Sequence, residues 1–236
     1  MVGNIGPQTL IIMPGAISRA LPTRITAPSM ARRVRDPHRK LVMRAAVFFA
    51  TRQGQTATIA KRVAIDLRAS GIEADVYNVR ELRRPIEWGI YDTALVAASV
   101  HVGHHEHEML RFVRDHRREL ERLDAGFLSV SLSEAGAEDR TATAEMRRTA
   151  AADAQRMINV FIGETGWRPL HALPVAGALA YSHYNFIVRL VMRWIARKAG
   201  APTDTSRDYE FTDWAAVNRF VQGIATEVRV RRQPTP

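Results

Sequence analysis

The stretch AAVFFATRQGQT, residues 45–56, decides the fold. Ala45–Ala50 is a short, continuous apolar run, which is typical of a strand buried on both faces of a parallel sheet. Thr51–Thr56 is a polar loop with one glycine, and the pattern after it predicts a helix over 57–69 that ends at Gly71. A buried strand, a tight loop and an amphipathic helix form the first unit of an α/β fold.

Strand and helix patterns keep alternating through the rest of the chain. Further strands are predicted at 73–79, 93–99, 126–131 and 168–179, and further helices at 107–120, 143–161 and 213–225, the last capped by Asp213. This order predicts a doubly wound parallel sheet of five strands with helices on both faces. In such a sheet a ligand is expected beyond the carboxyl ends of the strands, where the strand order switches.

The composition excludes several classes of protein. The 236 residues include no cysteine, so a disulfide scaffold, a thiolate metal site and a thiol nucleophile are all ruled out. Hydrophobic residues make up 46% and charged residues 25%, as in ordinary globular domains. The formal net charge of +10 indicates an anionic partner, which could be nucleic acid, a membrane surface or an acidic small molecule.

Most of this charge lies near the N-terminus. Residues 1–43 hold seven Arg or Lys residues against Asp36 alone, which is +6 of the +10, and include five prolines. We interpret 1–42 as a disordered basic leader or as translated sequence upstream of a true start at Met43; organelle targeting is the less favoured alternative. The expected domain is 43–228, followed by a basic tail at 229–236.

The loop after the first strand can bind a phosphate. Hydroxyls, amides, a glycine and the positive end of the next helix favour an anion at the residues Thr51, Arg52, Gln53, Gly54, Gln55 and Thr56. The spacing fits neither a Walker loop nor G-x-G-x-x-G, which disfavours a nucleoside triphosphate or a dinucleotide. The alternative is an ordinary strand-to-helix turn capped by Thr51 or Thr56.

Seven collinear segments resemble one known family. They are FFATRQGQT (48–56), ASVHVGHH (98–105), FLSVSL (127–132), VAGALAY (175–181), HYNFIVRLVMRW (183–194), PTDT (202–205) and YEFTDWAAVNRFVQGIA (209–225). Together they are similar to the menaquinone-dependent protoporphyrinogen IX dehydrogenases, which are flavodoxin-like. The resemblance implies noncovalent FMN, the substrate protoporphyrinogen IX, and menaquinone or ubiquinone as electron acceptor.

The resemblance also implies where the flavin ring would lie. It would rest between the loops 99–105 and 131–140, which adds the candidates Ser99, Val100, His101, Val102, Gly103, His104, Ser131, Leu132 and Ser133. This chain has His101 and Val102 where the family leads us to expect an arginine and an aromatic residue. The histidines and glutamates of HVGHHEHE (101–108) could alternatively bind a metal, but they lack a zincin spacing. We therefore expect no metal, and flavin contact or proton handling by His101 or His104.

A basic stripe marks the segment 184–198. Asn185, Arg189, Arg193 and Arg197 recur every four residues, so they share one side of a predicted helix whose other sides are apolar. A core helix with an exposed arginine edge would show the same pattern. The resemblance favours a helix in the membrane interface, with Arg189, Arg193, Trp194 and Arg197 contacting anionic lipid or substrate. It implies a peripheral protein on the cytoplasmic face of the inner membrane.

Two other functions remain open at this point. A flavodoxin-type electron carrier would use the same phosphate loop, and so would a flavin quinone reductase that takes electrons from NAD(P)H. Nucleic-acid binding is not expected, because no recognition motif accompanies the charge. The sequence identifies no catalytic acid or base and no oligomeric state.

Overall fold

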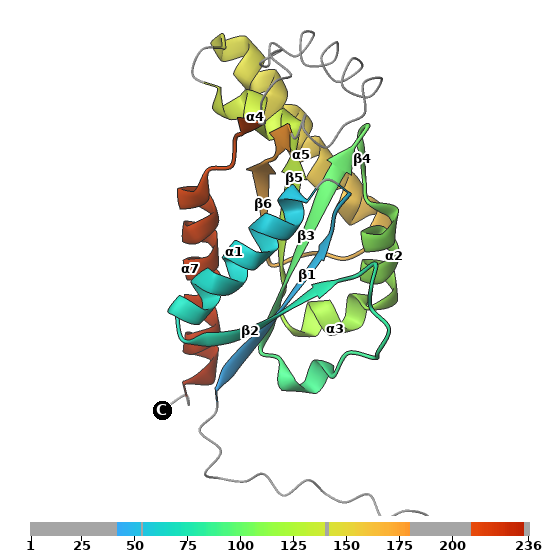
Figure 1. Ribbon diagram of the computed structural model, residues 1–236, viewed down its shortest axis with the longest axis vertical. Helices are drawn as coiled ribbons and strands as arrows, with labels where there is room; N and C mark the ends of the chain where they lie inside the picture. The colour runs from blue at the N-terminus through green and yellow to red at the C-terminus, as the bar shows by residue number, and fades with distance from the viewer. Residues whose placement is uncertain (1–41, 53, 140–141, 180–208, 234–236) are drawn as a thin grey trace, which may run out of the picture. The chain divides into compact units, whose positions relative to one another are not determined.

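The computed structural model describes residues 42–52, 54–139, 142–179 and 209–233. Its main sheet holds the parallel strands β1 (Met43–Ala50), β2 (Ile72–Asn78), β3 (Thr93–His101), β5 (Gly126–Ser131) and β6 (His171–Ala176). Their order is β2-β1-β3-β5-β6, which confirms the doubly wound parallel sheet (Figure 1). A sixth strand, β4 (His104–His105), pairs antiparallel with the end of β3, so the predicted count of five was one too low.

Helices cover both faces of the sheet. Helices α1 (Gln55–Ala69) and α7 (Trp214–Arg232) lie on one face (Figure 1). The other face carries α2 (His107–Asp115), α3 (Arg117–Arg122) and α5 (Ala144–Thr165). Helix α4 (Leu132–Glu138), a 3₁₀ turn (Trp88–Ile90) and the short pair β7 (Ala178–Leu179) and β8 (Tyr209–Glu210) complete the described elements.

Strand β1 shows why the sheet is buried on both sides. Ala45 and Val47 point into the core under α1 and α7, whereas Phe48 points into the core under α2 and α5. The ring of Phe48 lies 4.7 Å from that of Phe112 and 5.4 Å from that of Tyr77, centroid to centroid. A continuous apolar run is therefore needed here, because alternate residues serve two different cores.

Several element ends differ from the sequence prediction. The predicted helix 107–120 is broken at His116 into α2 and α3, and α5 continues to Thr165, where Gly166 ends it at a φ of 68°. Helix α7 begins at its predicted cap, where Asp213 Oδ1 accepts the Ala216 N–H at 2.9 Å, but it passes the predicted end. It continues to Arg232 because Val228 is also buried, so the segment predicted as a tail begins inside the helix.

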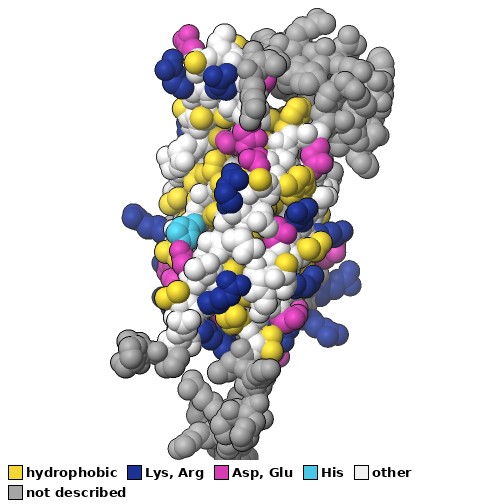
Figure 2. Space-filling view, turned by 90° about the vertical axis from the view of Figure 1, so that its left-hand side faces the viewer, with side chains coloured by type: hydrophobic (Ala, Val, Ile, Leu, Met, Phe, Trp, Pro, Cys, Tyr) yellow, Lys and Arg dark blue, Asp and Glu magenta, His cyan; other side chains and the backbone are white. Residues whose placement is uncertain are grey.

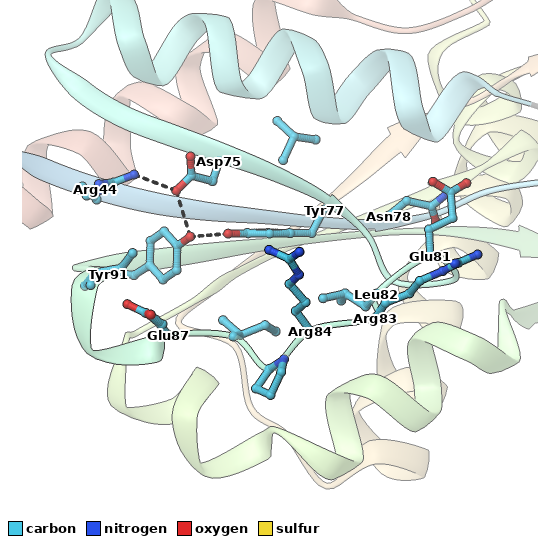
Figure 3. Close-up of a pocket in the computed structure, with 14 residues that line it drawn as sticks. Arg44, Asp75, Tyr77, Asn78, Glu81, Leu82, Arg83, Arg84, Glu87 and Tyr91 are labelled. Carbon is cyan, nitrogen blue, oxygen red and sulfur yellow. Dashed lines mark hydrogen bonds and ion pairs between the residues drawn. The ribbon is translucent and has the colours of Figure 1, made fainter.

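The segment between β2 and β3 encloses a pocket of about 630 Å³ beside the edge of the sheet (Figure 3). At one end Asp75 accepts hydrogen bonds from Arg44 at 3.0 Å and from the Tyr91 hydroxyl at 2.8 Å. The Tyr77 and Tyr91 hydroxyls lie 2.6 Å apart, and burial raises the pKa of Tyr91. Asp75 and the two tyrosine hydroxyls bond one another, which fastens the crossover segment to β2.

The face that carries α7 has a mixed charge. Basic and acidic side chains are interspersed over it rather than gathered by sign (Figure 2). One such pair is His171 and Glu227, 2.7 Å apart. Within the part of the chain that the structure describes, no helix combines the length and the apolar character needed to cross a membrane.

Candidate cofactor site

The carboxyl ends of three central strands lie at one edge of the sheet. The register pairs Ala50 at the end of β1 with Ala98 of β3, and Ser99 with Val130 of β5. The chain leaves β1 toward β2 and later returns to β3 on the opposite side of β1. The strand order therefore switches between β1 and β3, and the loops after these strands border the expected ligand position.

The loop after β1 presents the bare amino end of α1. Gly54 is the residue before the first turn of the helix, with a φ of 94°, and it has no side chain that could cap that turn. Thr51 Oγ1 accepts the Gly54 N–H at 3.0 Å and closes the loop, so Thr51 holds the strand-to-helix turn as the alternative prediction expected. Thr56 is buried in α1. The first turn holds no acidic residue, so its free N–H groups and the helix dipole favour an anion.

Other predicted phosphate-loop side chains bind groups of the protein. Gln55 Nε2 donates to Glu210 Oε1 and to Thr212 Oγ1, both at 2.9 Å, which ties α1 to the segment before α7. Thr56 is buried, and Arg52 is paired with Glu106. Gln53 lies outside the described residues. The backbone of the loop, rather than its long side chains, faces the expected anion.

The loop after β3 is a hairpin. Val100 pairs with His105 and His101 with His104, so a reversal at Val102 and Gly103 separates the two strands. Both turn residues have positive φ, 50° for Val102 and 82° for Gly103, as a two-residue hairpin turn requires. The alternation of apolar residues ends before this turn, which is why sequence reasoning predicted an open loop.

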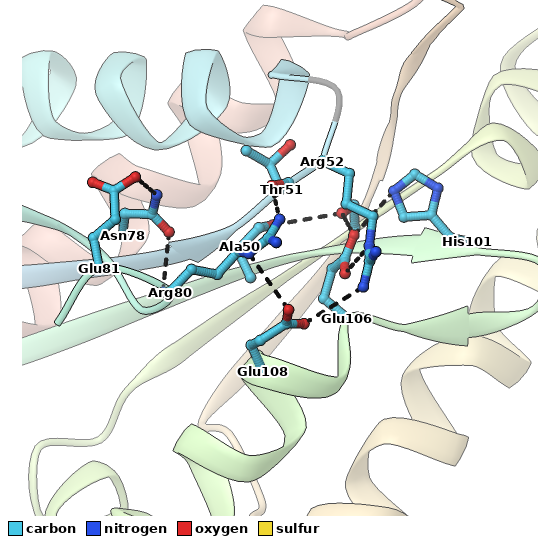
Figure 4. A network of polar contacts seen from close by, with 10 residues as sticks. Ala50, Thr51, Arg52, Asn78, Arg80, Glu81, His101, Glu106 and Glu108 are labelled. Atoms are coloured by element: carbon cyan, nitrogen blue, oxygen red, sulfur yellow. Dashed lines mark hydrogen bonds and ion pairs between the residues drawn. The ribbon is translucent and has the colours of Figure 1, made fainter.

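A polar network joins the two loops (Figure 4). Glu106 is only 3% exposed, and its Oε2 accepts a hydrogen bond from Arg52 Nε at 2.8 Å. Its Oε1 accepts from Ser99 Oγ at 3.3 Å and lies 3.1 Å from His101 Nε2. Glu108 lies 3.8 Å from Arg52 Nη2 and 3.4 Å from Arg80 Nε.

Sequence reasoning missed Arg80 and considered Glu106 and Glu108 only as possible metal ligands, not as partners of Arg52. Arg80 also donates to the Thr51 carbonyl at 3.2 Å, so the segment after β2 reaches the loop after β1. Glu106 directly precedes α2, where an acidic residue is ordinary. Its burial follows from the hairpin, which turns the chain back over the end of β1, and nothing in the sequence predicted that turn.

The three histidines of the hairpin have separate roles. His101 is partly buried and faces Glu106, whereas His104 is exposed. His105 is 4% exposed, bonds Ser129 Oγ through Nε2 at 2.9 Å, and packs against the stacked rings of Phe127 and Phe161. No group of three or more His, Asp or Glu side chains among the described residues could hold a metal ion.

The loop after β5 is helical. Ser131 is buried at the end of β5, and its Oγ accepts the Glu134 N–H at 3.3 Å, which starts α4. The predicted polar loop over 131–140 is thus wrong for Leu132–Glu138. Leu132 is 38% exposed and Ser133 half-buried beside the carboxyl end of the sheet. Arg189, Arg193, Trp194 and Arg197 lie outside the described residues.

Comparison with known proteins places the chain in a family. Residues 46–206 match the family model described as a flavodoxin domain. Over 183 residues the chain is 33% identical to the protoporphyrinogen IX dehydrogenase (quinone) of Escherichia coli K12, covering 78% of this chain and 95% of that protein. The chain belongs to the protoporphyrinogen IX dehydrogenase (quinone) family.

More distant similarities accompany this match. A family member from Leishmania major is 28% identical over 180 residues, which is 76% of this chain and 73% of that protein. Among solved structures, an archaeal flavodoxin aligns with 79% of this chain and 99% of its own, at 14% identity and a TM-score of 0.43.

The flavodoxin domain binds FMN, and the residues present fit that cofactor. The phosphate needs N–H donors, and the first turn of α1 supplies them behind Gly54. The Glu210 carboxylate beside this turn is bonded by Gln55 Nε2 at 2.9 Å. A Cβ at Gly54 would meet no atom within 4 Å, so the loop has room at this residue. Thr51 would keep the loop closed, while the hairpin after β3 and the start of α4 would flank the ring.

Proposed function

We propose that the protein oxidises protoporphyrinogen IX to protoporphyrin IX, with bound FMN and a membrane quinone, menaquinone or ubiquinone, as electron acceptor. Family membership together with the open, uncapped amino end of α1 at the switch point carries this proposal. FMN supplies the redox chemistry, by taking electrons from one substrate and passing them to the other. The protein supplies position and electrostatics.

Each loop of the site has a task in this reaction. The N–H groups of the first turn of α1 would bind the phosphate, and the bond from Gly54 to Thr51 keeps that turn in place. The pairing of Arg52 with Glu106 removes a free cation from the loop, so the phosphate would be held by neutral donors. The hairpin and the start of α4 would border the ring and exclude water from one side of it.

The test is an anaerobic assay with the purified, FMN-loaded protein. Protoporphyrinogen plus menaquinone or ubiquinone analogues should give porphyrin fluorescence without any pyridine nucleotide. Quinone reduction that requires NAD(P)H, with no porphyrin formed, would identify the flavin quinone reductase instead. Flavin that turns over with neither substrate would identify an electron carrier.

The membrane part of the proposal is separate and rests on the sequence 184–198. The predicted helix, with Arg189, Arg193 and Arg197 on one side and Trp194 beside them, would suit an anionic membrane surface, from which a quinone must be taken. This supports a peripheral position on the cytoplasmic face of the inner membrane.

Vesicle sedimentation tests this part. The protein should bind vesicles of anionic phospholipid, less at high salt, and the triple variant Arg189→Glu, Arg193→Glu, Arg197→Glu should lose that binding. The matched control is Arg114→Glu, Arg118→Glu, Arg122→Glu, which makes the same charge change on exposed positions of α2 and α3. Equal loss in both variants would show a nonspecific charge effect and contradict the docking helix.

A further inference from the structure

Glu106 is a buried carboxylate whose partners come from both cofactor loops. Arg52 belongs to the loop after β1, and Ser99 and His101 belong to β3. Its side chain is 2% exposed, whereas that of Arg52 is 55% exposed. A buried carboxylate needs such partners, since an unpaired one would be strongly destabilising. Glu106 is therefore stable in this position only when the two loops lie together. The two loops in turn are held together by Glu106.

The same carboxylate determines how His101 is oriented. His101 Nε2 lies 3.1 Å from Glu106 Oε1, at an angle unfavourable for a hydrogen bond. Because a carboxylate oxygen repels an unprotonated ring nitrogen at this distance, the Glu106 charge favours the tautomer with its proton on Nε2. The other ring nitrogen, Nδ1, is then unprotonated and able to accept a proton. The His101 side chain is 30% exposed, so this nitrogen can be reached from the site. A carboxylate behind a histidine is the general arrangement that orients a base and stabilises its protonated form.

We propose that His101 is the proton acceptor of this site and that Glu106 is its positioning residue. This inference rests on the proposed function. Oxidation of a porphyrinogen releases N–H or bridge C–H protons besides the electrons that the cofactor takes. In the assigned step a substrate N–H bond breaks, its electron pair stays on the substrate nitrogen, and a new N–H bond forms at His101 Nδ1. Glu106 then faces an imidazolium.

The charges around His101 set the direction of each test. Burial lowers the pKa of His101 most, Glu106 raises it, and Arg52 lowers it. Glu108 pairs with Arg52 and Arg80 rather than with His101, and His104 is the residue opposite His101 in the hairpin. Loss of the Glu106 charge should therefore lower the pKa of His101 further. Loss of the Glu108 charge should change it much less, because Glu108 contacts Arg52 and Arg80 rather than the histidine.

Ring NMR of the full chain provides a readout that does not depend on activity. In the wild type the His101 ring should show the Nε2-protonated tautomer. Glu106→Gln should weaken that preference and lower the pKa of His101, and Glu108→Gln, which removes the same charge two residues away, is the matched control. An unchanged tautomer and pKa in Glu106→Gln, with the fold intact by circular dichroism, would overturn the positioning role.

The pH profile of kcat/KM for protoporphyrinogen tests the proton-accepting role. The acid limb should follow the His101 pKa, and it should move to lower pH in Glu106→Gln. His101→Asn should remove this limb and lower kcat about 100-fold with little change in KM. An unchanged profile in both variants would overturn the proposal. A wild type that forms no porphyrin would instead refute the proposed function, and the NMR result would still decide whether Glu106 orients His101.

Discussion

His105 is a histidine that the fold needs in its neutral form. It is buried against the stacked rings of Phe127 and Phe161, and burial lowers its pKa from the ordinary 6.5 to about 4. In the unfolded chain it would take a proton near pH 6.5. The unfolded state therefore binds more protons than the folded state between pH 6.5 and 4, and stability falls as the pH falls through this window.

This gives a prediction for the variant His105→Gln, which can still bond Ser129 but does not titrate. The wild type should lose up to about 3 kcal/mol of unfolding free energy between pH 7 and pH 4 through this residue, at 1.36 kcal/mol for each pKa unit. The variant, less stable at pH 7, should lose correspondingly less over that range. Urea unfolding at several pH values measures both curves, and parallel curves would contradict the assignment.

Val102 is the strained residue of the hairpin. It is 99% exposed and has a φ of 50°, a conformation that a β-branched residue adopts only at a cost. Val102→Asn should raise the unfolding free energy by about 1 kcal/mol, because asparagine tolerates this region. Val102→Ala removes only the branching of the side chain, so it should raise the unfolding free energy by less. Chemical denaturation measures the unfolding free energy of both variants. A destabilised asparagine variant would show that the valine side chain makes a favourable contact.

At the level of elements, the close contact of α7 with β5 depends on Gly126. A Cβ there would lie 2.6 Å from Ile224 Cδ1 and 3.1 Å from Phe220 Cζ. Gly126→Ala should therefore lower the unfolding free energy by about 1–3 kcal/mol, because the added methyl group overpacks this contact. The control is Gly223→Ala within α7, where nothing lies within 4 Å and the change should stabilise by about 1 kcal/mol. Thermal unfolding of both variants tests this contact, and equal effects would contradict it.

A substitution in the loop after β1 should weaken the binding of FMN, which has a phosphate, but not that of riboflavin, which has none. Thr51→Val removes the acceptor of the Gly54 N–H, which loosens the turn that presents the free N–H groups of α1. We expect the Kd for FMN to rise about tenfold, a loss of about 1.4 kcal/mol, and the Kd for riboflavin to change little. Thr226→Val on α7 is the control. Equal weakening of both flavins in Thr51→Val would place the phosphate elsewhere.

The elements that were predictable are those with a strong apolar pattern. Ala45–Ala50 and the strand over 126–131 are continuous apolar or small-residue runs, and Asp213 is an ordinary helix cap. The hairpin at Val102 and Gly103 was missed because valine is a poor signal for a left-handed turn. Helix α4 was missed because LSEAGAE is short and polar.

The same reasoning explains the candidate site. Thr51, Gly54 and the loops after β3 and β5 were found because a doubly wound sheet brings its strand ends to one edge. Glu106 was considered only as a metal ligand, because its burial depends on a hairpin and on Arg52, 54 residues away in sequence. Contacts between loops that are distant in sequence have no periodic signature in a single chain.

At the scale of the whole molecule, the fold gathers three loops into one site and leaves much of the basic charge elsewhere. The predicted phosphate position is the first turn of α1 with its neutral N–H donors, and Arg52 is paired with Glu106. The +10 net charge is therefore not explained by the cofactor, and +6 of it lies in residues 1–43. The stripe over 184–198 remains the part of the sequence best suited to an anionic surface.

The most direct test of the central claim is anaerobic single-turnover spectroscopy of the FMN-loaded protein. Protoporphyrinogen added alone should bleach the visible flavin absorption while porphyrin fluorescence appears, and a quinone added next should restore the absorption. Flavin that stays oxidised with protoporphyrinogen but is bleached by NAD(P)H would contradict the account.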